Sequence, residues 1–215
     1  MRPLPILDRL ARGEAVAGRV DLTYSREPIS TWRDRWPSSP VPLSLPLPSM
    51  IFGFRCVGLM GRAHLAAYAE LGGTPRQFAL ALVRSQVDDS IIGTPFVELA
   101  ERPHEFGSID PGIRILSSGE IRPGRSMADE SKFNSMVIEF IEPIVAALAM
   151  LANGVAVLKP HVFTDLSRKE RKLRAATGLP SQYLHLGWKK KRAPFDEIGT
   201  DGHPPQISHR RRGVT

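Results

Sequence analysis

Cysteine is almost absent from this 215-residue chain, in which Cys56 is the single example. One cysteine allows no disulfide within the chain and excludes a zinc site built from several cysteines. The first residues also lack the apolar stretch of a secretion signal. We therefore expect a protein that works in a reducing, intracellular compartment.

The motifs of common enzyme classes are missing as well. Neither Gly-x-x-x-x-Gly-Lys nor Gly-x-Gly-x-x-Gly occurs, so a glycine-rich nucleotide loop is not expected. The six histidines form no His-x-x-x-His or His-x-Glu spacing, which would place two ligands on one face. No catalytic residue, metal or cofactor is predicted, and a non-enzymatic protein is favoured. A metal-dependent nuclease that uses Asp88, Asp89 and Glu98 is the enzymatic alternative, because acids near a basic surface could hold its metal.

Long apolar runs are rare, and the longest covers residues 133–158. Its apolar residues follow helical spacing and form one stripe: Phe133, Val137, Phe140, Ile144, Leu148 and Leu151. We expect a helix docked on a core, with Pro143 at a kink or in a first turn and Asn153-Gly154 at the end. A membrane span needs about 20 consecutive apolar residues. It is disfavoured here because Glu139 and Glu142 interrupt the run.

Proline and charge divide the chain into three predicted parts. Residues 1–49 form a proline-rich leader in which a short helix from Pro5 to Ala17 is the one expected element. Residues 50–192 form one α+β domain, a small mixed sheet with two or three packed helices. Residues 193–215 form a mobile basic tail.

Local patterns predict the elements of the domain. Met50–Val57 is rich in strand-forming residues and predicts the first strand. A helix is expected from Leu59 to Leu71, and the proline and capping-box glutamine of Thr74-Pro75-Arg76-Gln77 predict another that runs to Val87. Further short strands are predicted at residues 91–92, 96–99, 113–116 and 155–158.

Positive charge is concentrated at the C-terminal end. Residues 167–215 contain 12 Lys and Arg and four acids, a net charge of +8, whereas the first 166 residues hold 17 bases and 18 acids, a net charge of −1. Such an asymmetry suggests a polyanionic partner. Residues 165–192 are expected to form a basic helix-strand unit. A capping box of Ser167 and Glu170 starts the helix at Arg168, and Gly178 ends it.

The short helix should need anchoring, because isolated helices below about 12 residues are marginal in water. Leu166, Leu173 and Leu186 are the expected anchors. The nucleic-acid-binding residues would combine cations that neutralise phosphates with planar groups that stack on bases. These candidates are Arg168, Lys169, Arg171, Lys172, Arg174, Tyr183, Trp188, Lys189, Lys190, Lys191, Arg192, Arg210, Arg211 and Arg212.

Several of these features resemble a group of uncharacterised phage and prophage early-region proteins. They are the leader 45–48, which runs into an aromatic strand, the long apolar helix and the basic segment 166–173. Members of the group carry a tail with His-x-Arg-Arg-Gly-His, whereas residues 209–214 read His-Arg-Arg-Arg-Gly-Val and lack the second histidine. The resemblance implies a viral or mobile-element origin and the cytoplasm of a host cell, and it implies no activity.

Two functions are therefore expected as alternatives. The first is a non-enzymatic phage-type accessory protein that binds DNA or RNA through its basic C-terminal surface. The second is a protein-protein module for host takeover that captures or inhibits an acidic or nucleic-acid-handling host protein. Neither function requires a membrane.

Overall fold

The structure is a computed structural model of the chain. It describes residues 3–13, 17–23, 42–56, 72–103, 105–108, 112–124 and 140–188. Along the described chain the elements are α1 Pro5–Gly13, β1 Gly18–Asp21, β2 Ser49–Arg55, β3 Pro75–Arg84, β4 Ile91–Leu99, β5 Phe106–Ser108, β6 Ile113–Ile115, β7 Ile121–Pro123, α5 Glu142–Ala152, β8 Ala156–Val162, α6 Arg168–Ala176 and β9 Gln182–Trp188.

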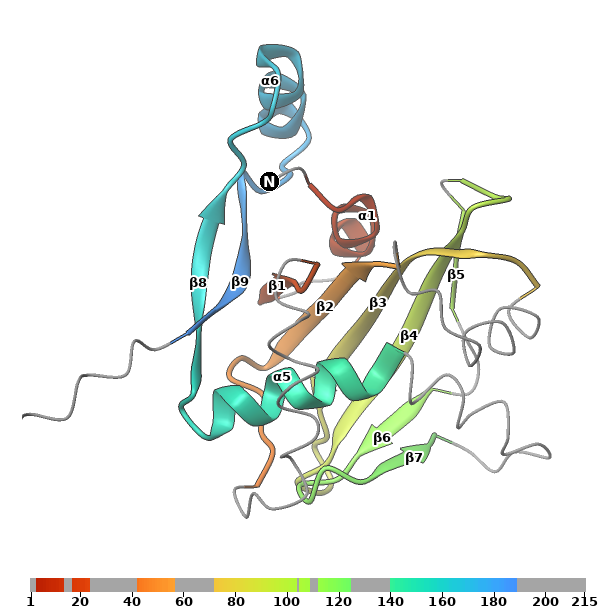
Figure 1. Ribbon diagram of the computed structural model, residues 1–215, viewed down its shortest axis with the longest axis vertical. Coiled ribbons are helices and arrows are strands. Elements are labelled where there is room, and N and C mark those ends of the chain that lie inside the picture. Colours follow the sequence, from red (N-terminus) through yellow and green to blue (C-terminus); the bar gives the residue numbers. More distant parts are fainter. Residues whose placement is uncertain are drawn as a thin grey trace, which may run out of the picture.

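The described strands form a nine-stranded mixed sheet in the order β7-β6-β4-β3-β2-β1-β9-β8, and β5 also pairs with β4. Strand β1 is parallel to both of its neighbours, β2 and β9. The remaining pairs are antiparallel. Helix α5 lies along one face of the sheet, α1 lies at the other, and α6 stands beyond the ends of β8 and β9 (Figure 1). The predicted α+β class is therefore confirmed, with a larger sheet than expected.

The face under α5 carries the main hydrophobic core. Phe52 and Phe54 share this face because side chains alternate along a strand. The ring centroids of Phe78 and Phe140 lie 4.8 Å apart, and those of Phe54 and Phe78 lie 5.6 Å apart. These aromatic contacts join β2, β3 and the chain that enters α5.

Helix α5 confirms the later part of the predicted apolar helix. Pro143 lies in its first turn, Asn153 is its C-cap residue, and Gly154 has φ = 66°, a conformation that favours glycine. Predicted helical residues before 140 lie outside the described residues. Among the described residues, no helix combines the length and apolar character that crossing a bilayer requires.

The predicted leader is wrong where the structure describes it. Helix α1 confirms the short helix, but Leu4, Ile6 and Leu7 are fully buried. Strand β1 pairs between β2 and β9, so it joins the two halves of the sheet. A four-residue strand has too short a pattern for sequence analysis, and its partners become visible only in the fold.

The predicted helix from residue 74 to Val87 is also wrong, because these residues form β3. Phe78, Leu80 and Leu82 alternate onto the α5 face, while β3 pairs with β2 and β4 over most of its length. Pairing on both sides overrides a helix start signal that is purely local. The helix predicted from Leu59 to Leu71 lies outside the described residues.

The elements predicted at residues 155–188 are confirmed. Strand β8 continues past Pro160, and β9 pairs with it along its whole length. Helix α6 begins with the predicted capping box, in which Ser167 and Glu170 each accept a backbone hydrogen bond from the other. Gly178 follows the helix with φ = 67°. Residues 189–192 and the tail 193–215 lie outside the described residues.

Candidate nucleic-acid interface

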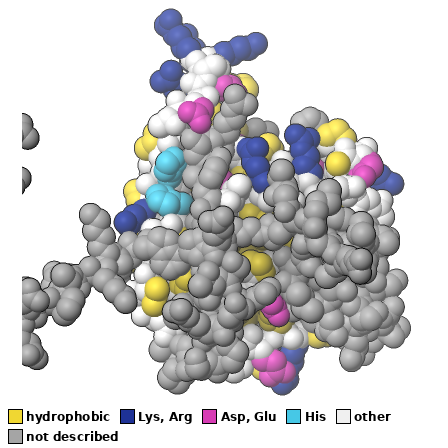
Figure 2. Space-filling view, in the orientation of Figure 1, with side chains coloured by type: hydrophobic (Ala, Val, Ile, Leu, Met, Phe, Trp, Pro, Cys, Tyr) yellow, Lys and Arg dark blue, Asp and Glu magenta, His cyan; other side chains and the backbone are white. Residues whose placement is uncertain are grey.

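Helix α6 connects β8 to β9 and projects beyond the sheet (Figure 1). Of its described side chains, only that of Arg174 is buried. The other basic side chains of the helix are exposed: Arg168, Lys169, Arg171 and Lys172. Figure 2 shows Lys and Arg side chains gathered at this end of the molecule. Here these four exposed residues are named the α6 basic face.

Helical geometry places the α6 basic face on the side away from the body. At about 100° per residue, the four side chains span an arc of about 160°, and Arg174 lies outside this arc. The carboxylate of Glu170 accepts a hydrogen bond of 2.8 Å from the backbone N–H of Ser167, so it turns toward the start of the helix. The outward surface of α6 is therefore cationic.

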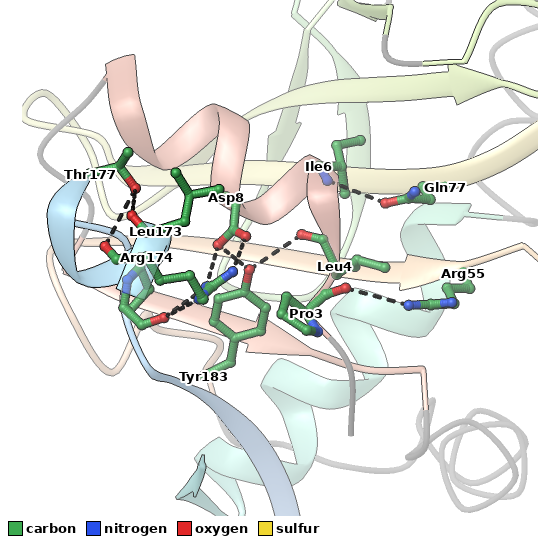
Figure 3. A network of polar contacts seen from close by, with 11 residues as sticks. Pro3, Leu4, Ile6, Asp8, Arg55, Gln77, Leu173, Arg174, Thr177 and Tyr183 are labelled. Carbon is green, nitrogen blue, oxygen red and sulfur yellow. Dashed lines mark hydrogen bonds and ion pairs between the residues drawn. The ribbon is translucent and has the colours of Figure 1, made fainter. Parts of the chain in front are cut away.

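Arg174 fixes the orientation of α6 through a buried ion pair (Figure 3). Its two terminal nitrogens donate to the carboxylate oxygens of Asp8 in α1, at 2.6 and 2.9 Å. Its Nε also donates to the carbonyl oxygen of Pro180 at 2.9 Å. The guanidinium lies 4.8 Å from the ring centroid of Phe163. A bidentate pair with a stacked guanidinium restrains both distance and direction.

Tyr183 completes this junction from β9. Its hydroxyl donates to Asp8, and its ring packs edge-on against Phe163 with centroids 4.7 Å apart. Burial, followed by the charge of Asp8, raises the pKa of the Tyr183 phenol, so it stays protonated. Burial alone would lower the pKa of Arg174, but hydrogen bonds with Asp8 raise it. Asp8, Arg174 and Tyr183 thus tie α1, α6 and β9 together.

Two residues of the predicted binding set are corrected by this junction. Arg174 and Tyr183 are 7% and 2% exposed, so neither can contact a phosphate or stack on a base. The predicted anchor Leu173 is wrong as well, because it is 58% exposed. Leu166 and Leu186 are buried as expected. Within α6 itself, the anchoring residue is therefore the charged Arg174, which is next to Leu173 in the sequence.

The remaining predicted residues lie beyond the described surface. Trp188 is the last residue of β9, and the structure does not describe its side chain. The same is true of the whole of Lys189, Lys190, Lys191, Arg192, Arg210, Arg211 and Arg212. The described part of the predicted site is therefore the α6 basic face.

A second polar group lies on the α1 face of the sheet, in the strands that carry α6. The register of β1, β9 and β8 places Asp21 and Lys159 on either side of His185, and Arg19 and His161 on either side of Tyr183. The rings of His161 and His185 meet edge-on, with centroids 5.3 Å apart. We name the set Arg19, Asp21, Lys159, His161 and His185 the hairpin polar patch.

Burial shifts two pKa values within the hairpin polar patch. Burial raises the pKa of Asp21, although its carboxylate accepts a hydrogen bond of 2.8 Å from the Thr23 N–H. Burial, together with the neighbouring His161 and Lys159, lowers the pKa of His185. His185 is therefore neutral near pH 7, and an added negative charge would favour its protonation.

The structure does not bring together the acids of the alternative nuclease site. Asp88 precedes β4 and Glu98 lies near its end, so the length of the strand separates them by about 20 Å. Hydrogen bonds from Ser90 and Ser85 hold the pKa of Asp88 at about 2. Glu98 is 1% exposed and accepts a hydrogen bond from Gln77. Within the described ranges, no group of three or more His, Cys, Asp and Glu residues is placed to hold a metal ion.

Sequence reasoning missed Asp8 and the hairpin polar patch. Asp8 and Arg174 are 166 positions apart, and no local pattern links them. Tyr183 and His185 lie on one face of β9 because side chains alternate along a strand, but their neighbours on β1 and β8 come from distant segments. Comparison with protein-family models, curated proteins and solved structures found no match.

Proposed function

We propose that the protein binds nucleic acid through the α6 basic face, as a phage-type accessory protein. The observation that carries this proposal is that the basic residues of α6 have two different roles. One buried arginine attaches the helix to the body of the protein, and the four other basic side chains are exposed on the outward side. Arg168, Lys169, Arg171 and Lys172 are exposed, so their charges are available to a polyanion.

Contacts with phosphates should dominate this binding. Phe163 and Tyr183 are both buried, so neither can serve as a platform for base stacking. Neutralisation of about four phosphates on a duplex gives a slope of log K against log salt of about −3.6. Affinity should then fall about a hundredfold between about 50 and 200 mM salt, with little dependence on base sequence.

The test is replacement of all four residues of the α6 basic face by alanine. Fluorescence anisotropy with labelled duplex DNA, duplex RNA and single strands at low salt should show a loss of affinity of about tenfold or more. The matched control removes four exposed arginines elsewhere: Arg76, Arg102, Arg114 and Arg122. Both variants lose the same net charge, so equal losses of affinity would show that overall charge, not α6, governs binding.

A protein partner is the second candidate, and two exposed apolar side chains favour it. Leu173 on α6 and Val162 at the end of β8 are each 58% exposed beside the cations. An acidic protein with an apolar centre would contact both kinds of group. Leu173→Ala should weaken capture of such a partner from nuclease-treated host lysate. The same change should leave the affinity for nucleic acid unaltered, so it separates the two candidates.

A further inference from the structure

Three buried polar atoms in the described residues have no hydrogen-bond partner, and all three belong to the hairpin polar patch. They are Nε of Arg19, Nε2 of His161 and Nδ1 of His185. Buried polar groups are nearly always hydrogen-bonded, so each of these three atoms is able to take a further partner. Their concentration on adjacent strands indicates one ligand that serves several groups.

The strand register brings these groups onto a single surface. In one row, Arg19 of β1 and His161 of β8 flank Tyr183, and in the next row Asp21 and Lys159 flank His185. His161 and His185 lie diagonally across the two rows with their rings in contact. Figure 2 shows His side chains at the surface, between α6 and the rest of the molecule. The two imidazole rings therefore border solvent, while the three unpaired nitrogens themselves are enclosed.

The charges around the patch favour an anion. Cationic side chains come from Arg19 on β1, Arg55 on β2 and Lys159 on β8, and His185 becomes a cation when it is protonated. Asp21 is the opposing acid, and its carboxylate is already engaged by the Thr23 N–H. Nearby Asp8 is paired with Arg174 and accepts from Tyr183. A metal ion is disfavoured, because the fixed cations would repel it.

We propose that the hairpin polar patch is a phosphate-binding site, formed by Arg19, Lys159, His161 and His185. Arginine and imidazolium groups donate charge-assisted hydrogen bonds to phosphate oxygens. The phosphate belongs either to a nucleic-acid backbone that also contacts the α6 basic face or to a small phosphate compound. Both sources present the same phosphate oxygens to the hairpin polar patch.

Binding of phosphate should be coupled to protonation of His185. An anion favours imidazolium, so the pKa of His185, which burial lowers in the free protein, should rise when phosphate is bound. For a phosphodiester such as duplex DNA, whose charge is constant in this range, affinity should therefore increase as the pH falls through the histidine range, about 7 to 5.5. Without phosphate, the lowered pKa of His185 means that the folded protein disfavours the imidazolium form. The contribution of His185 to the stability of the fold is therefore fully present above the unfolded pKa of about 6.5. It is lost as the pH falls through the pKa that His185 has in the folded protein.

The experiment is an NMR titration of the full-length, ¹⁵N-labelled protein with inorganic phosphate, at constant ionic strength set by chloride. The imidazole resonances of His161 and His185, assigned from His161→Asn and His185→Asn, should shift saturably, and the pKa of His185 should rise. The other histidines of the chain serve as internal references: His64, His104, His203 and His209. Arg19→Gln should weaken binding about tenfold or more. Arg114→Gln, which alters an exposed pair with Asp88, is the matched control and should change nothing.

Any of three results would overturn the proposal. The first is that the two histidines show no saturable shift that the other histidines lack. The second is that Arg19→Gln and Arg114→Gln have equal affinities for phosphate. The third is that Zn²⁺ binds more tightly than phosphate. Circular dichroism should show that Arg19→Gln keeps its fold, so that weaker binding reports on the site.

A second titration with duplex DNA identifies the source of the phosphate. If duplex DNA moves the same imidazole resonances and displaces inorganic phosphate, the ligand is the nucleic-acid backbone. If only inorganic phosphate moves them, the ligand is a small phosphate compound. The variant without the α6 basic face should keep its response to inorganic phosphate, so failure of DNA binding by α6 does not imply failure of this site.

Discussion

Helices α5 and α6 have similar lengths, 11 and nine residues, but opposite means of support. Seven side chains of α5 are buried in the main core, whereas in the described structure α6 buries Arg174 alone. Hydrophobic packing defines α5, while α6 depends on its capping box and one ion pair. The comparison shows how a helix can be fixed in place with almost its whole surface left available for a partner.

The strongest way to break this comparison is to remove the support of α6. Asp8→Ala leaves the buried Arg174 without its carboxylate partner and removes one of the two acceptors of the Tyr183 hydroxyl. Loss of one partner of a buried pair costs about 3 to 5 kcal/mol, so the free energy of unfolding in urea should fall by about that amount. Arg174→Met in the Asp8→Ala background should recover part of the loss. No recovery would mean that the ion pair is not the support.

A core substitution in α5 tests the other half of the comparison. Leu148 is fully buried, and Leu148→Ala should cost about 2 to 5 kcal/mol through lost burial and the cavity left behind. Chemical denaturation gives the value. A cost below about 1 kcal/mol would show that α5 is not packed as a core helix.

The capping box provides a smaller and local contribution. Ser167→Ala removes the side chain that accepts from the Glu170 N–H. Substitutions of this kind cost about 1 kcal/mol. Hydrogen exchange should show faster exchange in α6 and unchanged exchange in α5. Equal changes in both helices would argue against separate support.

The smallest effect is expected when an exposed leucine of α6 is replaced by alanine. Leu173→Ala removes a side chain that is 58% exposed, so the free energy of unfolding should change by less than about 0.5 kcal/mol. The paired Leu148→Ala measurement provides the scale. A cost comparable to that of Leu148→Ala would restore the sequence-based view that Leu173 anchors α6.

Local signals predicted the parts of this fold whose causes are local. Ser167, Glu170 and Gly178 bound α6 as expected, because caps act within one turn. Strand β3 was missed because the stretch that opens it fits a helix start equally well, and pairing with β2 and β4 decides the outcome.

The candidate site shows the same limit. The sequence predicted five basic binding residues in α6, and four of them form the exposed α6 basic face. That Arg174 faces inward depends on Asp8, which lies 166 positions away. Likewise, the hairpin polar patch arises from the register of three strands that are distant in the chain. No periodicity within one segment encodes such contacts.

The central claim is that the α6 basic face, held by Arg174, contacts phosphates, and the salt dependence of duplex binding tests it most directly. Dissociation constants are measured over a range of salt for the parent protein and for the variant in which Arg168, Lys169, Arg171 and Lys172 are alanine. The account predicts that the slope of log K against log salt becomes less negative by about 3 to 4 in the variant. Equal slopes for the two proteins would contradict it.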